Sequence, residues 1–154
     1  MKYLLTRWML QSVGRLSDGV RLGWRTGFDS GVMLEYVYEN RPRGISPLGV
    51  WLDGLFLSNE VWDGVRSRRD LLIGQLTAAL GYYERPTVFD MAAGVGSYLF
   101  ALPSERATIV AGDFADEAVA AGQAKALRLG RADIVFRKSD AFRREGLACQ
   151  AADV

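Results

Sequence analysis

The sequence predicts an α/β protein in which a helical N-terminal region precedes a parallel β-sheet. From Pro86 onward, apolar segments of strand length alternate with segments of helical periodicity, as in parallel strands joined by right-handed crossovers. Three predicted strands each end in or near an Asp residue, and a glycine-rich loop follows the first strand. Before Pro86 the pattern is helical and is interrupted by Gly and Pro residues.

The composition excludes several classes of function. The chain has 154 residues, 49% hydrophobic and 24% charged, which is typical of a globular protein with its own core. Its net charge of +1 gives no electrostatic case for a nucleic-acid partner. There is no His, and Cys149 is the single Cys, so His-based catalysis and an intramolecular disulfide are excluded and no metal site is predicted. A lone Cys fits a reducing compartment, and we expect a cytoplasmic location.

Residues 1–20 are predicted to form an amphipathic helix. Apolar side chains recur there at helical spacing, at Leu5, Met9, Val13, Leu16 and Val20. Arg7 interrupts the apolar run that a signal peptide needs, and no stretch approaches the ~20 apolar residues of a membrane span. We expect the apolar stripe to pack on the protein; peripheral contact with a membrane surface, or docking of a partner, is the alternative.

Two further helices are predicted before Pro86. The first covers residues 31–39, with Asp29 or Ser30 as its N-cap and Pro42 beyond its end. The second lies within residues 63–86 and stops at Gly81. Its apolar face carries Leu72, Leu76, Ala79 and Leu80. Near its start lie three arginines, Arg66, Arg68 and Arg69. We interpret them as a solvated basic face, and a phosphate or carboxylate clamp is the alternative.

The C-terminal region, residues 86–154, is predicted to form the sheet, and residues 1–85 a helical cap or lid region. The expected strands are residues 87–91, 108–113 and 133–140; the expected helices are residues 96–102 and 115–130, the second closed by Gly130. Ligands of such sheets bind at the carboxyl ends of the strands. We therefore expect a shared site at these ends, formed by Asp90, Asp113 and Asp140.

The loop after the first strand indicates a ligand with a positive charge. Gly94 and Gly96 tolerate positive φ and let a ligand approach the backbone, while the predicted helix behind them offers free N–H groups. A tight turn without a ligand is the alternative. The Gly-Lys-Ser/Thr sequence of a P-loop is absent, and Leu99 stands at the third glycine position of the dinucleotide pattern. A mononucleotide-like, cationic ligand accounts best for Asp90.

These segments resemble the class I S-adenosylmethionine-dependent methyltransferases. "VFDMAAGVGSYL" is similar to their acid and glycine loop, "IVAGDFADEAVAAGQAKA" to their second strand and helix, and "ADIVFRKSDAF" to their third strand. Together with "GWRTGFDSGVMLEYVYENRPRG", the chain resembles a narrower family of putative methyltransferase domains, which some proteins carry fused to an α/β-hydrolase. The general resemblance covers residues 86–154 and implies a Rossmann-like fold and S-adenosyl-L-methionine as cofactor.

The resemblance also implies roles for the residues at the strand ends. Asp90 would hold the ammonium end of the cofactor, and Gly94 and Gly96 would lie against its methionine part. Ala92 departs from the family, which has a glycine at that loop position. The nucleoside half would be held by four residues: Asp113 at the ribose hydroxyls, Phe114 beside the adenine, Asp140 at the adenine amino group and the Ala141 amide at a ring nitrogen.

No residue is predicted to be catalytic, because the sulfonium is already activated and alignment does most of the work. Residues 24–38 are predicted to form a lid over the cofactor and a small-molecule or lipid acceptor. The candidate residues are Trp24, Arg25, Asp29, Tyr36 and Tyr38. The alternative is that Tyr36 and Tyr38 anchor their helix to the domain.

Asp153 and Val154 are similar to the start of a fourth strand, which the family pairs beside the first. From this we expect an incomplete form of the domain, inactive or nearly so alone, with an open edge of the first strand that promotes self-association. Two other functions remain as alternatives: a non-catalytic binding or interaction module on the same fold, and an NAD-dependent oxidoreductase, which Leu99 disfavours.

Overall fold

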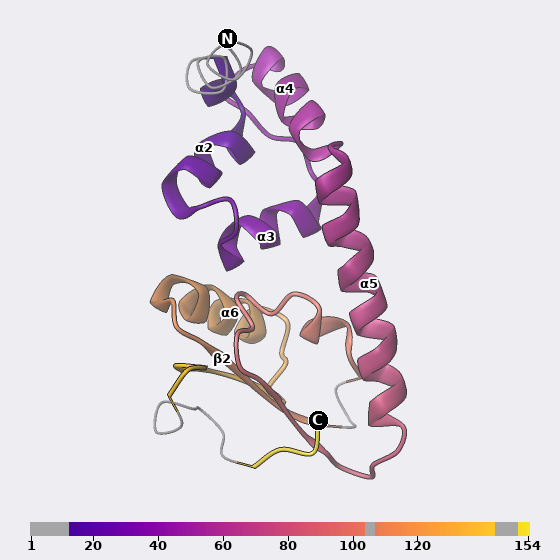
Figure 1. The fold of residues 1–154 in the computed structure, drawn as a ribbon. Helices are drawn as coiled ribbons and strands as arrows, with labels where there is room; N and C mark the ends of the chain where they lie inside the picture. Colours follow the sequence, from indigo (N-terminus) through magenta and orange to yellow (C-terminus); the bar gives the residue numbers. More distant parts are fainter. Residues whose placement is uncertain (1–12, 104–106, 144–150) are drawn as a thin grey trace. The chain divides into compact units, whose positions relative to one another are not determined.

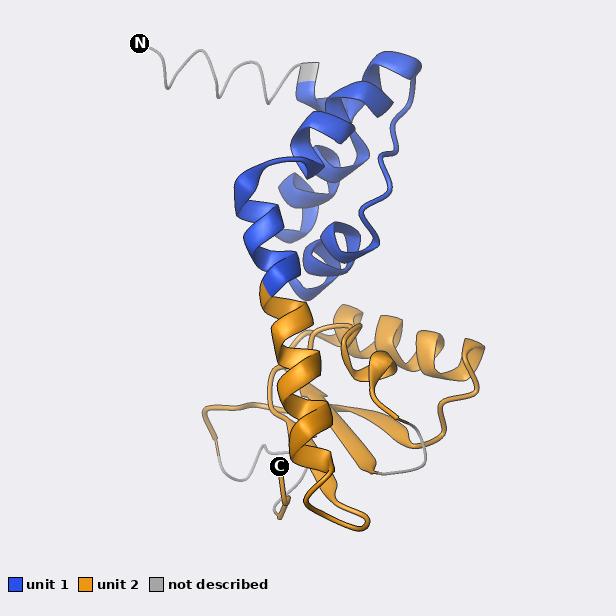
Figure 2. Ribbon diagram, turned by 90° about the vertical axis from the view of Figure 1, so that its right-hand side faces the viewer, with its two compact units in different colours: residues 1–67 blue, residues 68–154 orange. Residues whose placement is uncertain are grey.

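The computed structural model describes residues 13–103, 107–143 and 151–154. Their elements, in chain order, are η1 (Val13–Leu16), α2 (Asp18–Thr26), α3 (Gly31–Glu39), α4 (Pro47–Leu57), α5 (Glu60–Leu80), β1 (Thr87–Asp90), η2 (Leu99–Ala101), β2 (Thr108–Asp113), α6 (Asp116–Arg128) and β3 (Ile134–Lys138) (Figure 1). The chain divides into two compact units, residues 1–67 and residues 68–154 (Figure 2). This division falls within α5, whereas the predicted one at Pro86 marks the change from helix to strand.

In the first unit, three helices begin at a serine N-cap. The hydroxyls of Ser17, Ser30 and Ser46 accept hydrogen bonds from the amides of Val20, Met33 and Gly49, at 3.0, 3.1 and 3.1 Å. Each bond satisfies an amide that the helix itself leaves unpaired, which fixes where the helix starts. The prediction of α3 is therefore confirmed, with Ser30 rather than Asp29 as the N-cap.

The prediction of one helix through residue 20 is wrong for the described part of that segment. A 3-10 turn, η1, ends at Leu16, and Ser17 then adopts an extended backbone (φ −80°, ψ 134°) and caps a new helix. The start of α2 is tied to a later segment, because the Asp18 amide donates to the Arg43 carbonyl at 3.1 Å. Residues 1–12, which carry Leu5 and Met9 of the predicted amphipathic stripe, lie outside the described residues.

The core of the first unit lies between α3, α4 and the first turns of α5. Its buried members are Met33, Tyr36, Val37 and Leu57, with Leu22, Phe56, Trp62 and Val65 packed against them. Arg66 is anchored here rather than solvated: its Nη2 donates to the Leu57 carbonyl at 3.0 Å, and it pairs with Asp63. The interpretation of the three arginines as a solvated face therefore fails for Arg66, while Arg68 is exposed.

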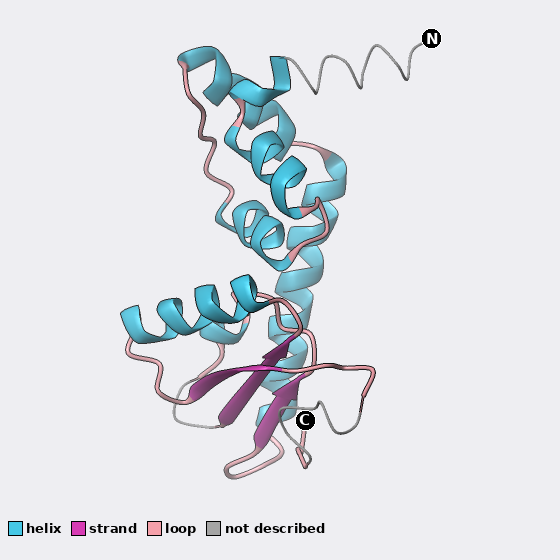
Figure 3. Ribbon diagram, turned by 90° about the vertical axis from the view of Figure 1, so that its left-hand side faces the viewer, coloured by secondary structure: helices cyan, strands magenta, loops and turns pink. Residues whose placement is uncertain are grey.

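In the second unit, β1, β2 and β3 form a parallel sheet, as predicted, and their order is β1-β2-β3 (Figure 3). One sheet face is buried, because residues at alternating positions of the strands join the core. These residues are Val88, Ile109, Ala111, Ile134 and Phe136. Leu76 and Leu80 of α5 belong to the same core, which confirms the apolar face predicted for that helix.

Helix α6 packs on this face at very close range. A Cβ added to Gly122 would lie 2.3 Å from the Phe136 ring, so only a glycine lets the helix approach this closely. The helix ends at Arg128, and Gly130, with a φ of +65°, closes it as predicted. Beyond it, the Arg131 amide donates to the Ala126 carbonyl at 3.0 Å, which completes a Schellman cap.

The C-terminal residues pair with the outer side of β1. The Phe89 amide donates to the Val154 carbonyl at 2.9 Å, and the Val154 amide donates to the Thr87 carbonyl at 3.3 Å. This is the hydrogen-bond pattern of a parallel pair, so Val154 stands where a fourth strand beside β1 would start. Self-association through the remaining edge stays a prediction.

Candidate functional site at the strand ends

The parallel register places the carboxyl ends of the strands at one edge of the sheet. Asp90 ends β1 and Asp113 ends β2, while Asp140 follows two residues after β3. The Ser139 amide donates to the Asp113 carbonyl at 2.9 Å, so the segment carrying Asp140 begins directly beside Asp113. All three carboxylates therefore belong to the edge at which parallel sheets bind ligands.

The glycine loop between β1 and η2 folds back onto Asp113. The Gly94 amide donates to Asp113 Oδ2 at 2.7 Å, and the Ala93 amide donates to the Gly112 carbonyl at 2.8 Å. Gly94 and Gly96 have φ of +59° and +67°, which side-chain-bearing residues rarely adopt. The structure therefore requires glycine at both positions for the turn itself.

The helix predicted for residues 96–102 is wrong. The positive φ of Gly96 is incompatible with a right-handed helix there, and the chain makes turns up to Tyr98, followed by one 3-10 turn, Leu99–Ala101. The loop consequently lacks the α-helix N-terminus that would favour an anion. What it presents instead is backbone bracketed by two carboxylates, Asp90 and Asp113.

These two carboxylates make the site electrostatically negative. Burial, together with the nearby charge of Asp113, raises the pKa of Asp90, although a hydrogen bond from the Ala92 amide at 3.0 Å offsets part of this effect. A carboxylate pair of this kind attracts a cation, because the positive charge relieves the repulsion between them.

Asp113 has a structural role as well. Its Oδ2 accepts from Gly94, and its Oδ1 accepts from the Ala115 amide at 2.8 Å, just before α6 begins. Each carboxylate oxygen carries a further lone pair, so Asp113 can still accept hydrogen bonds from a ligand. Its position allows it both to brace the loop and to bind.

The predicted adenine-side residues lie on the more exposed part of this edge. Phe114 is 70% exposed, and Lys138 Nζ lies 5.1 Å from its ring centroid. Asp140 Oδ1 accepts from the Phe142 amide at 3.0 Å, and Ala141 is exposed between them. An exposed aromatic ring and an acid at the same edge of the sheet are compatible with a planar, hydrogen-bonding ligand. The roles of Phe114, Asp140 and Ala141 stay predictions.

The predicted lid residues all belong to the first unit. Tyr36 is buried and anchors α3, while Arg25 and Asp29 are exposed. Trp24 stacks edge-on against Phe28 at 5.7 Å between ring centroids. Tyr36 therefore anchors its helix, as the alternative interpretation expected. The lid itself stays a prediction, as does the role of Tyr38.

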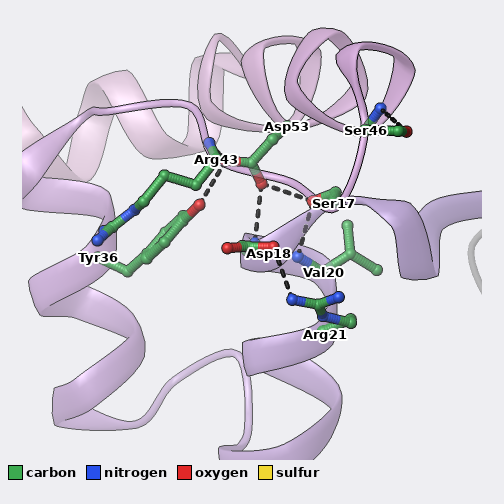
Figure 4. Close-up of polar contacts among 10 residues, drawn as sticks. Ser17, Asp18, Val20, Arg21, Tyr36, Arg43, Ser46 and Asp53 are labelled. Atoms are coloured by element: carbon green, nitrogen blue, oxygen red, sulfur yellow. Dashed lines mark hydrogen bonds and ion pairs between the residues drawn. The ribbon is translucent and has the colours of Figure 1, made fainter.

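The sequence gives no sign of a buried polar cluster in the first unit, centred on Asp53 (Figure 4). The Asp53 side chain is fully buried, and its Oδ1 accepts from Ser17 Oγ at 2.5 Å and from the Gly19 amide at 2.8 Å. Its Oδ2 accepts from the Tyr36 hydroxyl and from the Arg43 amide, the latter at 2.8 Å. Four donors therefore satisfy one buried carboxylate.

A family model described as "Putative methyltransferase" matches residues 1–152. The uncharacterized protein YnbC of Escherichia coli (strain K12) is 37% identical over 158 residues, which cover 96% of this chain and 27% of that protein. The chain thus spans about a quarter of the length of this relative.

A solved structure shares the fold. The crystal structure of a "possible exported protein" from Bordetella parapertussis matches with a TM-score of 0.59 at 21% identity, over 75% of this chain and 39% of that one. At this identity the likeness concerns the fold alone. Among the helices that the structure describes, none has the length and apolar character to cross a membrane.

Proposed function

The chain belongs to the family described as "Putative methyltransferase", and on this premise we propose that residues 68–154 bind S-adenosyl-L-methionine for methyl transfer to a small-molecule or lipid acceptor. The observation that carries the proposal is the hydrogen bond between the Gly94 amide and Asp113. It brings the glycine loop of β1 and the acid of β2 together at the carboxyl edge of the sheet.

The residues present fit this cofactor. Asp113 keeps unused lone pairs for the two ribose hydroxyls, and the loop, which is exposed at Met91 and Ala92, can lie against the methionine part. The carboxylates of Asp90 and Asp113 suit the ammonium and sulfonium charges. Ala92 is exposed, so its methyl group is accommodated by the loop although the family has a glycine there.

When bound, S-adenosyl-L-methionine supplies a methyl group on a positively charged sulfur that is already activated. The protein then has to hold the donor, exclude water and align an acceptor, none of which requires a histidine. We assign Asp113 and the loop to holding the donor and name no catalytic residue.

Calorimetric titration of the chain with S-adenosylhomocysteine tests the proposal. Asp113→Ala is expected to weaken binding roughly ten- to a hundredfold, because one hydrogen bond to a charged group contributes about 1.5–3 kcal/mol. Glu117→Ala is the matched control, since it removes an exposed acid from the first turn of α6.

Equal affinities of Asp113→Ala and Glu117→Ala would contradict the assignment of Asp113. Titration with NAD tests the oxidoreductase alternative. That alternative requires that the chain bind NAD and that it not bind S-adenosylhomocysteine. Binding without methyl transfer to any acceptor tried would favour the non-catalytic module.

A further inference from the structure

A pocket of about 440 Å³ lies within the first unit, and none of its lining residues belongs to the strand-end site. Its lining comes from α2, from α3 and from the segment after α3. The lining residues are Asp18, Arg21, Leu22, Arg25, Tyr36 and Arg43. This volume falls within the range of about 300–1,000 Å³ that small-molecule sites occupy.

The pocket is basic. Arg21 Nη2 pairs with Asp18 Oδ1 at 2.7 Å, and Arg43 Nη2 pairs with Glu39 Oε2 at 2.6 Å. These two pairs leave the charge of Arg25 uncompensated. Arg25 stands one helical turn after Arg21 on α2 and makes no hydrogen bond or ion pair with the residues that the structure describes.

The walls of the pocket are held in place by Asp53. Its carboxylate accepts from Gly19 at the start of α2, from the Tyr36 hydroxyl on α3 and from the Arg43 amide. One buried group thus ties together the three segments that carry the pocket's side chains. A preorganised site of this kind loses little conformational entropy when a ligand binds.

The Arg43 side chain lies along the Tyr36 ring (Figure 4), with its guanidinium carbon 4.5 Å from the ring centroid. Stacking on one face and pairing with Glu39 fix the orientation of this guanidinium. Leu22 and the Tyr36 ring supply apolar surface beside the charges. The pocket therefore combines fixed guanidinium groups, one uncompensated charge and an apolar wall.

Guanidinium groups bind carboxylate and phosphate oxygens through paired N–H bonds, and the apolar wall suits a carbon skeleton. We propose that this pocket binds a small organic molecule through its oxyanion group, a carboxylate or a phosphate, with Arg25 as the main contact. The proposal rests on the first unit alone and stands whether or not the second unit binds S-adenosyl-L-methionine.

Calorimetric titrations of the full chain with phenyl phosphate and with benzoate test this, with benzyl alcohol as the uncharged probe. At least one of the two anions is expected to bind and benzyl alcohol is not. Arg25→Gln should weaken anion binding about tenfold or more, which corresponds to about 1.4 kcal/mol. Because Arg25 is exposed and has no partner among the described residues, this variant should keep the parent's thermal melt.

Arg68→Gln is the matched control, because it removes another exposed arginine, from a helix that does not line the pocket. Arg25→Lys keeps the charge without the paired N–H groups and should bind with intermediate affinity. Failure of both anions to bind, equal weakening in Arg25→Gln and Arg68→Gln, or equal binding of benzyl alcohol would each overturn the proposal.

A further experiment distinguishes two sources of the oxyanion, a lipid headgroup and a soluble molecule. Vesicles of phosphatidylcholine, with and without phosphatidic acid, are sedimented with the parent chain and with Arg25→Gln. Binding that needs both phosphatidic acid and Arg25 identifies a lipid headgroup as the ligand. Anion binding in calorimetry without such sedimentation identifies a soluble molecule, and both outcomes support the pocket.

Discussion

The Gly94 amide and the Asp113 carboxylate are joined by a 2.7 Å hydrogen bond across 19 residues of chain. The same carboxylate receives the Ala115 amide on its other oxygen. One side chain therefore holds both the glycine loop and the entry to α6. Any change at Asp113 acts on stability and on the proposed site together, and the two effects need separate measurements.

We expect Asp113→Ala to lower the free energy of unfolding by about 1–3 kcal/mol, because the partly buried Gly94 amide and the exposed Ala115 amide lose their acceptor. Asp113→Asn should cost less, since its amide oxygen keeps one of the two bonds. Urea unfolding followed by circular dichroism measures both. Unchanged stability in Asp113→Ala would show that the loop is held by its glycines alone.

The raised pKa of Asp90 predicts a pH dependence. A carboxyl group whose pKa is higher in the folded than in the unfolded chain binds its proton more tightly when folded, so its ionisation costs stability. The penalty sets in as the pH rises through the pKa of the unfolded chain, near the ordinary value of 3.8, and is complete above the folded pKa.

Asp90→Asn should therefore raise the free energy of unfolding at pH 7.5. This gain in stability should disappear as the pH falls toward 3.8, the ordinary pKa of the carboxyl group. Urea titrations of parent and variant at both ends of this range test the sign. A variant less stable than the parent at pH 7.5 would mean that the ionised carboxylate stabilises the loop.

Asp53→Ala is expected to destabilise the first unit by at least about 3 kcal/mol, because it leaves four donors without an acceptor. Asp29→Ala, which removes an exposed carboxylate from the same unit, should change stability by less than about 0.5 kcal/mol. Thermal and urea unfolding compare the two. Similar small effects would show that the Asp53 cluster contributes no net stability.

Two glycines in helices should respond oppositely to alanine. A Cβ at Gly122 would lie 2.3 Å from the Phe136 ring, whereas a Cβ at Gly74 meets nothing within 4 Å. We expect Gly122→Ala to cost about 1–3 kcal/mol through overpacking, and Gly74→Ala to add about 0.5–1 kcal/mol through helix propensity. Equal shifts in the midpoint of urea unfolding would contradict the close packing of α6 on β3.

The sequence predicted best the elements whose apolar pattern has a clear period. The β-strands, α3, the second half of α5 and α6 all alternate or repeat visibly, and Gly130 and Ser30 mark ends that the structure confirms. By contrast, α4 was missed. Its sequence "PLGVWLDGLFL" is apolar nearly all round and contains two glycines, so it shows no helical stripe.

The Asp53 cluster was missed for a related reason. An aspartate between Leu52 and Gly54 normally indicates an exposed turn, and its four donors come from segments 10 to 36 residues away in the chain. Only the fold brings Ser17, Tyr36 and Arg43 to it. The wrong helix after Gly96 has a local cause, since the φ that a glycine adopts is not readable from its neighbours.

The Phe136 ring fills the space above two glycines at once, because a Cβ at Gly96 would also lie 2.9 Å from it. The glycine loop and α6 are therefore shaped around one aromatic side chain of β3. In the family, position 122 should therefore vary with position 136, whereas position 96 should stay glycine because its φ is +67°. Homologues with a smaller residue at position 136 should be the ones in which a side chain appears at position 122.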